Sequence, residues 1–508
     1  MSRTDLLVIA PGNGRLIYQE LAQEYAAIEP PIWAGMLANS ARHAGYEVAI
    51  VDQEAQGFSA EKVAAEAATH DPRLIAIVVY GQQPSASTQT MTAAGEVAAA
   101  LRRAGADAPV VLLGGHPSAL PERSLLETEV DAVCQGEGPH TLRALLALDD
   151  PADRRRWHEV PGLWYRSDGG VSSNPRAPLI PAEELPELLP GVAWDLLPME
   201  RYRAHNWHCF GHLDRRTPYG SIYTSLGCPY RCAFCCINAP FGKSSFRYWP
   251  PEFTVAQIKR LRAEYGVRNL KIADEMFVLN ERHYLAICEG IVREGIDDLN
   301  IWAYARVDTV KSEPLALMRR AGVRWLCLGI ESASRFVRDG VRKGKFGREQ
   351  IFDTVKRIRD AGIYVIGNYI FGLPDDTFDS MQETLDVAME LNCEMANFYC
   401  ATAYPGSALY ERAVKEGWPL PEEWHHYSQH SRWSKPLPTE TLSGEQVLAF
   451  RDWAWQVYFT NPRYLEMVRR TFGIVTVRHI RKLTAIRLER EHLWTPEGEE
   501  TPRVEQIA

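Results

Sequence analysis

The stretch Cys228-Pro229-Tyr230-Arg231-Cys232-Ala233-Phe234-Cys235 holds three cysteines in a C-x3-C-x2-C spacing, with an aromatic residue directly before the last. Three thiolates from one short loop can bind three irons of a cubic [4Fe-4S] cluster. The fourth iron is then left without a cysteine, and an open iron can bind a substrate. The spacing therefore predicts a catalytic cluster rather than one that only carries electrons.

Two other interpretations of these cysteines are a structural zinc site and unpaired core thiols. A structural zinc site usually has four protein ligands, from two cysteine pairs or from cysteines with histidine partners. No second pair follows, and Cys288, Cys327, Cys393 and Cys400 are scattered singly. Cys236 is adjacent to Cys235, too close to point the same way, and is expected to be a buried thiol.

Downstream of the cysteines, strand-like and helix-like segments alternate. Strands are expected at 221–225, 270–273, 300–305, 325–330, 365–371 and near 395–400. Each ends in a polar cluster, and the carboxyl ends of parallel barrel strands carry chemistry.

The cysteine spacing with these clusters resembles the radical S-adenosylmethionine (SAM) enzymes. The resemblance implies a partial (β/α)6 barrel, an open iron that chelates the amino and carboxylate groups of SAM, and reductive cleavage of SAM to a 5′-deoxyadenosyl radical. It implies cluster ligation by Cys228, Cys232 and Cys235, and SAM contacts from Phe234, Asp274, Glu275, Arg306 and Glu331. Many relatives carry two aspartates where this chain has Asp274-Glu275, so which carboxylate reaches the SAM amino group stays open.

Residues 5–150 also alternate between strands and helices. Strands are expected at 6–10, 48–52, 74–79, 110–115 and 130–133, with a helix over about 31–43. This order predicts a doubly wound, Rossmann-like α/β sheet, whose ligands bind beyond the carboxyl ends of the strands. Taken alone, the pattern is equally that of a flavodoxin-like module of unknown ligand.

Segments 29–34, 45–48, 113–117 and 135–138 resemble the cobalamin-binding domain that precedes many radical SAM cores, as in the class B methyltransferases. The resemblance implies cobalamin contacts from Gly114, Gly115, His116, Gly136, Glu137 and Gly138. No histidine of this chain stands in the D-x-H-x-x-G pattern whose histidine binds cobalt. Base-off cobalamin without a histidine lower ligand is therefore expected, with His116 in a structural or tail-contacting role.

Two further regions complete the expected organisation. Residues 151–205 are a connector with a hairpin at Asp168-Gly169. Beyond residue 416, Ser443 and Gln446 look like a capping box for a helix to about Phe459. The expected domains are 1–150 (cobalamin-binding), 151–205 (connector), 206–415 (radical SAM core) and 416–508 (a mainly helical, aromatic-rich region). The histidines and tryptophans between 418 and 433 are expected to pack against the barrel rather than to line a substrate pocket.

Composition limits the surroundings of the chain. The 508 residues carry a net charge of −9, which argues against a nucleic acid as main partner. We find no apolar run long enough for a transmembrane segment and no signal-peptide pattern. The ten cysteines suit a reducing, cytoplasmic compartment better than a disulfide framework.

The leading hypothesis is a cobalamin-dependent radical SAM methyltransferase that methylates a carbon or phosphorus of a small-molecule or lipid precursor. It would take electrons from a donor such as flavodoxin or ferredoxin. A second hypothesis keeps both cofactors for a cyclisation, oxidation or rearrangement without methyl transfer. A third, from another class, is a cobalamin- or redox-sensing binding protein with a vestigial core.

Overall fold

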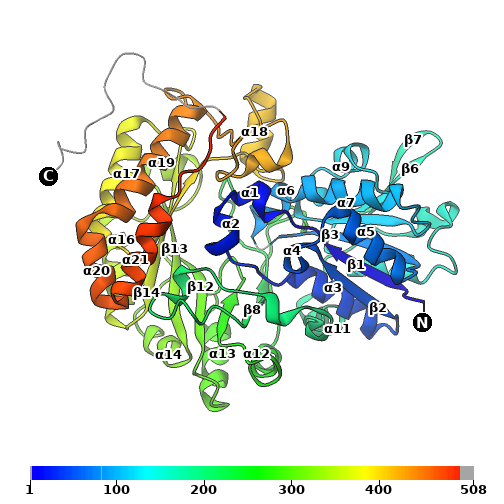
Figure 1. The fold of residues 1–508 in the computed structure, drawn as a ribbon, viewed down its shortest axis with the longest axis horizontal. Helices are drawn as coiled ribbons and strands as arrows, with labels where there is room; N and C mark the ends of the chain where they lie inside the picture. The colour runs from blue at the N-terminus through cyan, green and yellow to red at the C-terminus, as the bar shows by residue number, and fades with distance from the viewer. Residues whose placement is uncertain (1–2, 82, 492–508) are drawn as a thin grey trace.

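A computed structural model describes residues 3–81 and 83–491 and shows two largely parallel sheets side by side (Figure 1). The first has the order β2-β1-β3-β4-β5-β6-β7. Its strands are β1 (Leu6–Ala10), β2 (Val48–Asp52), β3 (Leu74–Val79), β4 (Val110–Gly114), β5 (Ala132–Cys134), β6 (Leu163–Ser167) and β7 (Gly170–Ser173). Strands β1 and β3 are buried throughout, because helices cover both faces of the sheet.

The helices of this part are those of a doubly wound fold. They are α1 (Gly14–Tyr18), α2 (Leu21–Glu24), α3 (Ile32–His43), α4 (Gln53–Gln56), α5 (Ala60–Thr69), α6 (Pro84–Gln89), α7 (Met91–Arg103), α8 (Gly115–Ala119), α9 (Pro121–Glu127) and α10 (Pro139–Leu146). The predicted connector hairpin is β6–β7, and it extends this sheet because Leu163 pairs antiparallel with Cys134. The connector also contains α11 (Leu185–Leu188).

The second sheet is six-stranded and open, in the order β15-β14-β13-β12-β11-β8. Its parallel strands are β8 (Tyr219–Ile222), β11 (Asn269–Ile272), β12 (Asn300–Arg306), β13 (Val323–Glu331), β14 (Tyr364–Phe371) and β15 (Met395–Cys400). A two-stranded ribbon of β9 (Ser225–Leu226) and β10 (Arg247–Tyr248) encloses the cysteine loop. The predicted α/β fold, with a doubly wound domain before a partial barrel, is confirmed.

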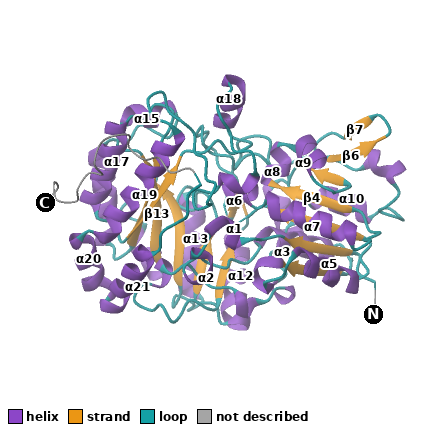
Figure 2. Ribbon diagram, turned by 45° about the horizontal axis from the view of Figure 1, so that its top comes forward, coloured by secondary structure: helices purple, strands orange, loops and turns teal. Residues whose placement is uncertain are grey.

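Helices surround the strands of both sheets (Figure 2). Those of the barrel are α12 (Pro251–Tyr265), α13 (Glu281–Arg293), α14 (Leu315–Arg320), α15 (Arg335–Gly340), α16 (Arg348–Asp360), α17 (Phe378–Leu391) and α18 (Ala408–Glu416). The C-terminal region adds α19 (Gly444–Thr460), α20 (Pro462–Phe472) and α21 (Ile474–Ala485), and the Ser443–Gln446 capping box is present. No bounds were predicted for α21 from the sequence.

One hydrophobic core runs through both parts. It includes Val8 of β1, Trp194 and Tyr202 of the connector, and Ile222 of β8, all at most 4% exposed. Because this core is continuous, the carboxyl ends of both sheets are held at fixed positions facing a common space. Within the described residues, no helix is both long and apolar enough to cross a membrane.

Candidate functional site

The cysteine loop begins at Gly227, whose φ of +83° favours glycine. A side-chain carbon at this position would lie 2.6 Å from the Ser245 carbonyl oxygen, so glycine lets the two ends of the loop close together. Cys228 is buried, whereas Cys232 and Cys235 are partly exposed. The Cys235 amide donates to the Cys232 carbonyl at 3.1 Å, which folds the triplet into a turn.

The barrel holds the loop from two sides. The Ala233 amide donates to the carbonyl of Val341 at 2.9 Å, and the Ala233 carbonyl accepts from the amide of Leu409 at 2.8 Å. Phe234 packs against buried residues that include Val337 and Leu409. Phe234 therefore fixes the loop on the barrel, a structural role beside its predicted place in the SAM site.

Two cations lie next to the cysteines. Arg306 Nη1 is 3.7 Å from the Cys232 sulfur, and its guanidinium stacks on Tyr230 with 3.9 Å to the ring centroid. Burial alone would lower the pKa of Arg306, but hydrogen bonds and the charge of Asp308 raise it overall, so it is charged. A guanidinium here compensates the negative charge that metal-bound thiolates bring into a buried site.

The second cation is Lys343, which sequence reasoning missed. Its Nζ is 2.5 Å from a carboxylate oxygen of Glu331, and both side chains are buried. Glu331 has a φ of +64° at a register shift between β13 and β14, which turns its side chain out of the strand pattern. A carbon at Gly329 would lie 2.5 Å from the Lys343 nitrogen, so glycine makes room for the pair. Nothing in the sequence around Lys343 signals this contact.

The predicted carboxylate pair separates into two roles. Asp274 is 1% exposed and accepts three hydrogen bonds of 2.6 Å, from the Thr224 amide, the Thr224 hydroxyl and the Ser225 hydroxyl. Both carboxylate oxygens of Asp274 therefore already accept hydrogen bonds from the protein. Glu275 instead lines a cleft, and burial, reinforced by the charge of Asp274, raises its pKa to about 8.

This cleft separates the cysteine loop from the first sheet. Its barrel wall includes Tyr223, Gly227 and the buried thiol Cys236, and its opposite wall includes Gly115 and His116. Trp33 and Tyr80 form a stacked pair in the same cleft, with ring centroids 4.0 Å apart and an interplanar angle of 11°. Sequence reasoning did not single out this aromatic pair, although Trp33 lies inside the segment 29–34 that carries the resemblance.

His116 is 1% exposed, and burial lowers its pKa to about 3, so the ring is neutral. Its Nδ1 is 3.2 Å from the hydroxyl of Thr88, while its Nε2 is buried without a hydrogen-bond partner among the described residues. The ring lies edge-on to Trp424, with centroids 4.3 Å apart. The orphaned Nε2 is an atom that a bound ligand could satisfy.

The other predicted cobalamin residues do not line the cleft. Gly114 has a φ of +155°, and a side-chain carbon there would lie 2.1 Å from the Val79 carbonyl oxygen. The Gly136 carbonyl accepts a 2.8 Å hydrogen bond from Tyr80, and a carbon at Gly138 would crowd Leu37. These glycines permit close backbone packing beneath the cleft.

Glu137 connects the two halves of the molecule. One carboxylate oxygen is 2.8 Å from Arg247 Nη2 and the other accepts from the Ile180 amide at 2.8 Å. Arg247 in turn donates to the Ile180 carbonyl at 2.7 Å. The buried pair joins the loop after β5 to β10 beside the cysteine loop.

A cavity of about 320 Å³ lies between the barrel strands, helix α1 and the C-terminal helices. Gln83 lines both this cavity and the cleft, so the two spaces adjoin. The segment 418–433, which is rich in tryptophan and histidine, contains both residues that pack against a sheet and residues that line this cavity. Trp424 and Tyr427 do pack, but on the first sheet rather than on the barrel as predicted, whereas His430 lines the cavity.

Comparison with known proteins matches this arrangement. A B12 binding domain model matches residues 20–146, and a radical SAM superfamily model matches residues 222–388. The chain thus joins a B12-binding domain to a radical SAM domain, and it is a radical SAM enzyme of the cobalamin-binding kind. The predicted family resemblance is confirmed.

The chain is 29% identical to an uncharacterized methyltransferase of Pyrococcus horikoshii over 459 residues, which is 90% of this chain and 94% of that protein. It is 26% identical to the anaerobic magnesium-protoporphyrin IX monomethyl ester cyclase of Cereibacter sphaeroides, over 78% of this chain and 62% of the cyclase. The fold is that of the radical S-adenosylmethionine methyltransferase TsrM from Kitasatospora setae, solved with cobalamin and a [4Fe-4S] cluster. That match has a TM-score of 0.67 and 18% identity, and covers 95% of this chain and 100% of TsrM.

The two domains imply a [4Fe-4S] cluster, SAM and cobalamin, and the residues present fit these groups. Three thiols on one loop next to two cations suit an iron–sulfur cluster, and the carboxylate of Glu275 in the adjoining cleft suits an ammonium group. Gly115 and the orphaned His116 Nε2, which lie in the cleft at the carboxyl edge of the first sheet, suit a ligand held there.

Proposed function

We propose that this enzyme is a cobalamin-dependent methyltransferase that acts on an unactivated carbon or phosphorus of a small-molecule or lipid precursor. The observation that carries the proposal is the cleft with Glu275 and the cysteine loop on one wall and His116 on the other. This cleft adjoins the 320 Å³ cavity at Gln83. On this proposal, two cofactor sites and a substrate-sized space would share one junction.

The chemistry supplied by the bound groups is reductive cleavage of SAM to a 5′-deoxyadenosyl radical at the cluster and donation of a methyl group from methylcobalamin. Cys228, Cys232 and Cys235 would hold the cluster. Glu275, whose pKa is raised in the cofactor-free protein, would lose its proton when the SAM ammonium binds and would then accept charge-assisted hydrogen bonds from it. Arg306 and Glu331 would contact the SAM carboxylate and ribose, as the family resemblance implies.

The other residues of the site act by positioning. Asp274 ties β11 to the β8–β9 connection through its three hydrogen bonds and so fixes the backbone from which Glu275 projects. Lys343 holds Glu331 in place and adds positive charge near Cys232. The ion pair of Glu137 and Arg247 holds the cobalamin domain against the cysteine loop.

Cobalamin would bind base-off, without a histidine below the cobalt. Supporting this, His116 is locked by Trp424 and Thr88, and the loop after β1 contains no histidine. We propose that residues 1–150 form the cobalamin-binding unit, 151–205 the connector, 206–415 the radical core and 416–508 a C-terminal region that closes the cavity. A flavodoxin- or ferredoxin-type donor in a reducing cytoplasm would supply electrons.

Anaerobic reconstitution with iron, sulfide, cobalamin, SAM and a reductant tests the proposal. With its substrate, the enzyme should form 5′-deoxyadenosine and S-adenosylhomocysteine, and the product should gain about fourteen mass units per turnover. 5′-Deoxyadenosine without S-adenosylhomocysteine would favour a cyclase or oxidase instead, a possibility raised by the cyclase relative. No SAM cleavage by protein that holds an intact cluster would favour a cobalamin- or redox-sensing binding protein.

A further inference from the structure

The cavity beside the cofactor cleft has walls that specify its ligand. We propose that it binds the uncharged, flat ring portion of a substrate that carries a hydroxyl or carbonyl group, and leaves any charged portion outside. This deepens the proposed function, since the ligand would be the molecule that is methylated. The volume of about 320 Å³ lies within the range of small-molecule sites, about 300–1,000 Å³.

Eight tyrosine, tryptophan and phenylalanine residues are part of the cavity lining. Trp302 of β12 meets Trp207 edge-on, with centroids 5.2 Å apart, and meets Tyr304 at 5.1 Å. Phe398 of β15 and Trp455 of α19 line the cavity from the C-terminal side. Aromatic side chains favour flat ring systems through stacked and edge-to-face contacts.

The buried charges of the lining residues are already compensated. Glu29 lies 2.9 Å from Lys271 Nζ and 3.5 Å from His205 Nε2. Burial alone would raise the pKa of Glu29, but these neighbours outweigh it, so the carboxylate stays ionised. A charged ligand group inside the cavity would have to break this pair or be buried unpaired, and both are costly.

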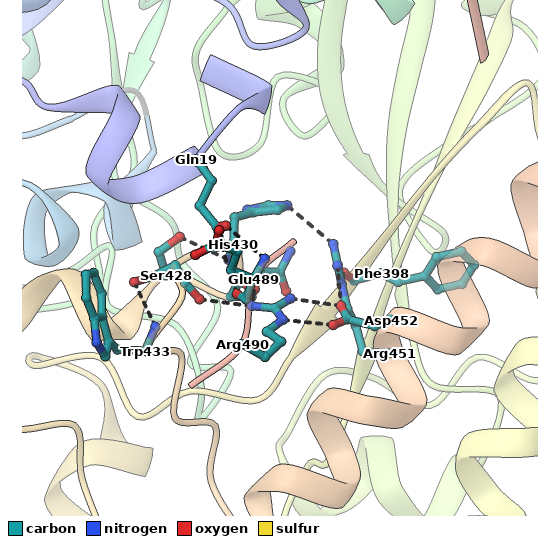
Figure 3. A network of polar contacts seen from close by, with 11 residues as sticks. Gln19, Phe398, Ser428, His430, Trp433, Arg451, Asp452, Glu489 and Arg490 are labelled. Carbon is teal, nitrogen blue, oxygen red and sulfur yellow. Dashed lines mark hydrogen bonds and ion pairs between the residues drawn. The ribbon is translucent and has the colours of Figure 1, made fainter. Parts of the chain in front are cut away.

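The second charged group of the lining is Arg451, which is 6% exposed. Arg451 donates to the Phe398 carbonyl at 2.9 Å and to Asp452 at 2.9 Å, and its third nitrogen is 3.3 Å from His430 Nε2 (Figure 3). Each of the three guanidinium nitrogens therefore already has a partner within the protein. Arg487, which also lines the cavity, is exposed to solvent.

Neutral hydrogen-bonding groups, in contrast, remain available. Tyr18, Tyr304 and Tyr399 line the cavity, and no hydrogen bond found between described residues uses their hydroxyls. Burial raises the pKa of Tyr18 to about 12 and that of Tyr304 well above its ordinary value, so both are protonated. Phenols can donate to a carbonyl or accept from a hydroxyl of the ligand.

The test measures binding without turnover. The full-length enzyme, reconstituted anaerobically with cluster and cobalamin but without SAM, is dialysed to equilibrium against 2-naphthol, naphthalene or 2-naphthoate. We expect 2-naphthol to bind most tightly, naphthalene about two- to tenfold more weakly, and 2-naphthoate more than about tenfold more weakly. If 2-naphthoate binds as tightly as 2-naphthol, the proposal is overturned.

Variants assign the binding to this cavity. Asn397→Trp fills the space beside β15 and should abolish 2-naphthol binding, whereas Val475→Trp, at an exposed position of α21, should leave it unchanged. Tyr304→Phe, which keeps the ring, should weaken 2-naphthol by about two- to tenfold without affecting naphthalene. Unchanged 2-naphthol affinity in Tyr304→Phe and Asn397→Trp would overturn the assignment. Absence of methyl transfer with intact probe binding would instead count against the proposed function alone.

Discussion

Arg490 and Asp452 form a two-point ion pair, in which Nε and Nη2 of Arg490 each lie 2.9 Å from one carboxylate oxygen of Asp452 (Figure 3). The same guanidinium donates to the carbonyls of Gln429 and Ser431. Gln19 of the cobalamin domain exchanges two hydrogen bonds with the backbone of Glu489. The segment after α21 is thereby fastened across the cavity that its residues Ile486 and Leu488 line.

Replacing Arg490 should loosen this segment. Arg490→Gln removes charge-assisted hydrogen bonds that contribute about 1.5–3 kcal/mol each. We expect faster limited proteolysis after α21 and weaker retention of cavity ligands, with the barrel still folded. Arg481→Gln, nine residues away, exposed and not part of the cavity lining, is the matched control and should behave as the wild type. Equal protease sensitivity of the two variants would contradict the role given to the ion pair.

Each cluster cysteine should be individually necessary. Cys228→Ser, Cys232→Ser or Cys235→Ser should lose bound iron and sulfide after anaerobic reconstitution, because a cubane with one iron open to substrate depends on all three thiolates. Cys236→Ser is the control, since its thiol is adjacent but buried against the cleft. Loss of the cluster from Cys236→Ser, with retention in any of the other three, would disprove the assignment.

Substitutions of the two neighbouring carboxylates, Glu275 and Asp274, should have different effects. Glu275→Gln should fold normally and weaken SAM binding at least about tenfold, since an ammonium loses its charged partner. Asp274→Asn should lower the stability by about 1–3 kcal/mol, because an amide group replaces an acceptor of three hydrogen bonds. Equilibrium dialysis with SAM and thermal unfolding separate the two effects. An unchanged SAM affinity in Glu275→Gln would remove this residue from the SAM site.

Glu275 should also make stability depend on pH. Its pKa is raised from 4.5 to about 8 in the folded protein, mainly by burial. Between pH 4.5 and 8 the folded protein keeps the Glu275 proton, whereas the unfolded protein loses it. The stabilisation that this proton provides is fully present below about pH 4.5. It declines as the pH rises towards 8, by up to about 1.4 kcal/mol per pH unit. Thermal unfolding of cofactor-free protein across this range should show a shallower decline for Glu275→Gln than for the wild type. Parallel curves would contradict the shift.

The buried pair between Glu137 and Arg247 should matter more than a surface pair. Arg247→Met leaves the Glu137 carboxylate buried without its cation and should cost about 3–5 kcal/mol. Arg156→Met breaks a pair with Glu159 whose side chains are each 45% exposed, and should cost at most about 1 kcal/mol. Chemical denaturation measures both. If the two variants are equally stable, the ion pair does not hold the domains together.

Local sequence patterns were sufficient to predict most strands of both sheets. Strands β2, β3 and β15 lie at the predicted residues, because apolar runs bounded by turn residues have few alternatives. The bounds of helix α21 were not predicted, since its basic residues indicated only a solvated helix face. Glu331 was predicted at the end of its strand, but its backbone conformation and its contact with Lys343 were not.

By itself, the sequence determined the order of the two domains and the cysteine loop, because ligand spacing and strand periodicity are local properties of the chain. The tertiary structure alone decided that Glu275 rather than Asp274 faces the cleft. It also decided that Glu137 forms an ion pair with Arg247, and that residues 18, 304, 399 and 451 line one cavity. These relationships join residues up to hundreds of positions apart. Burial, which sets their charges and partners, exists only once the sheets and the C-terminal helices have packed together.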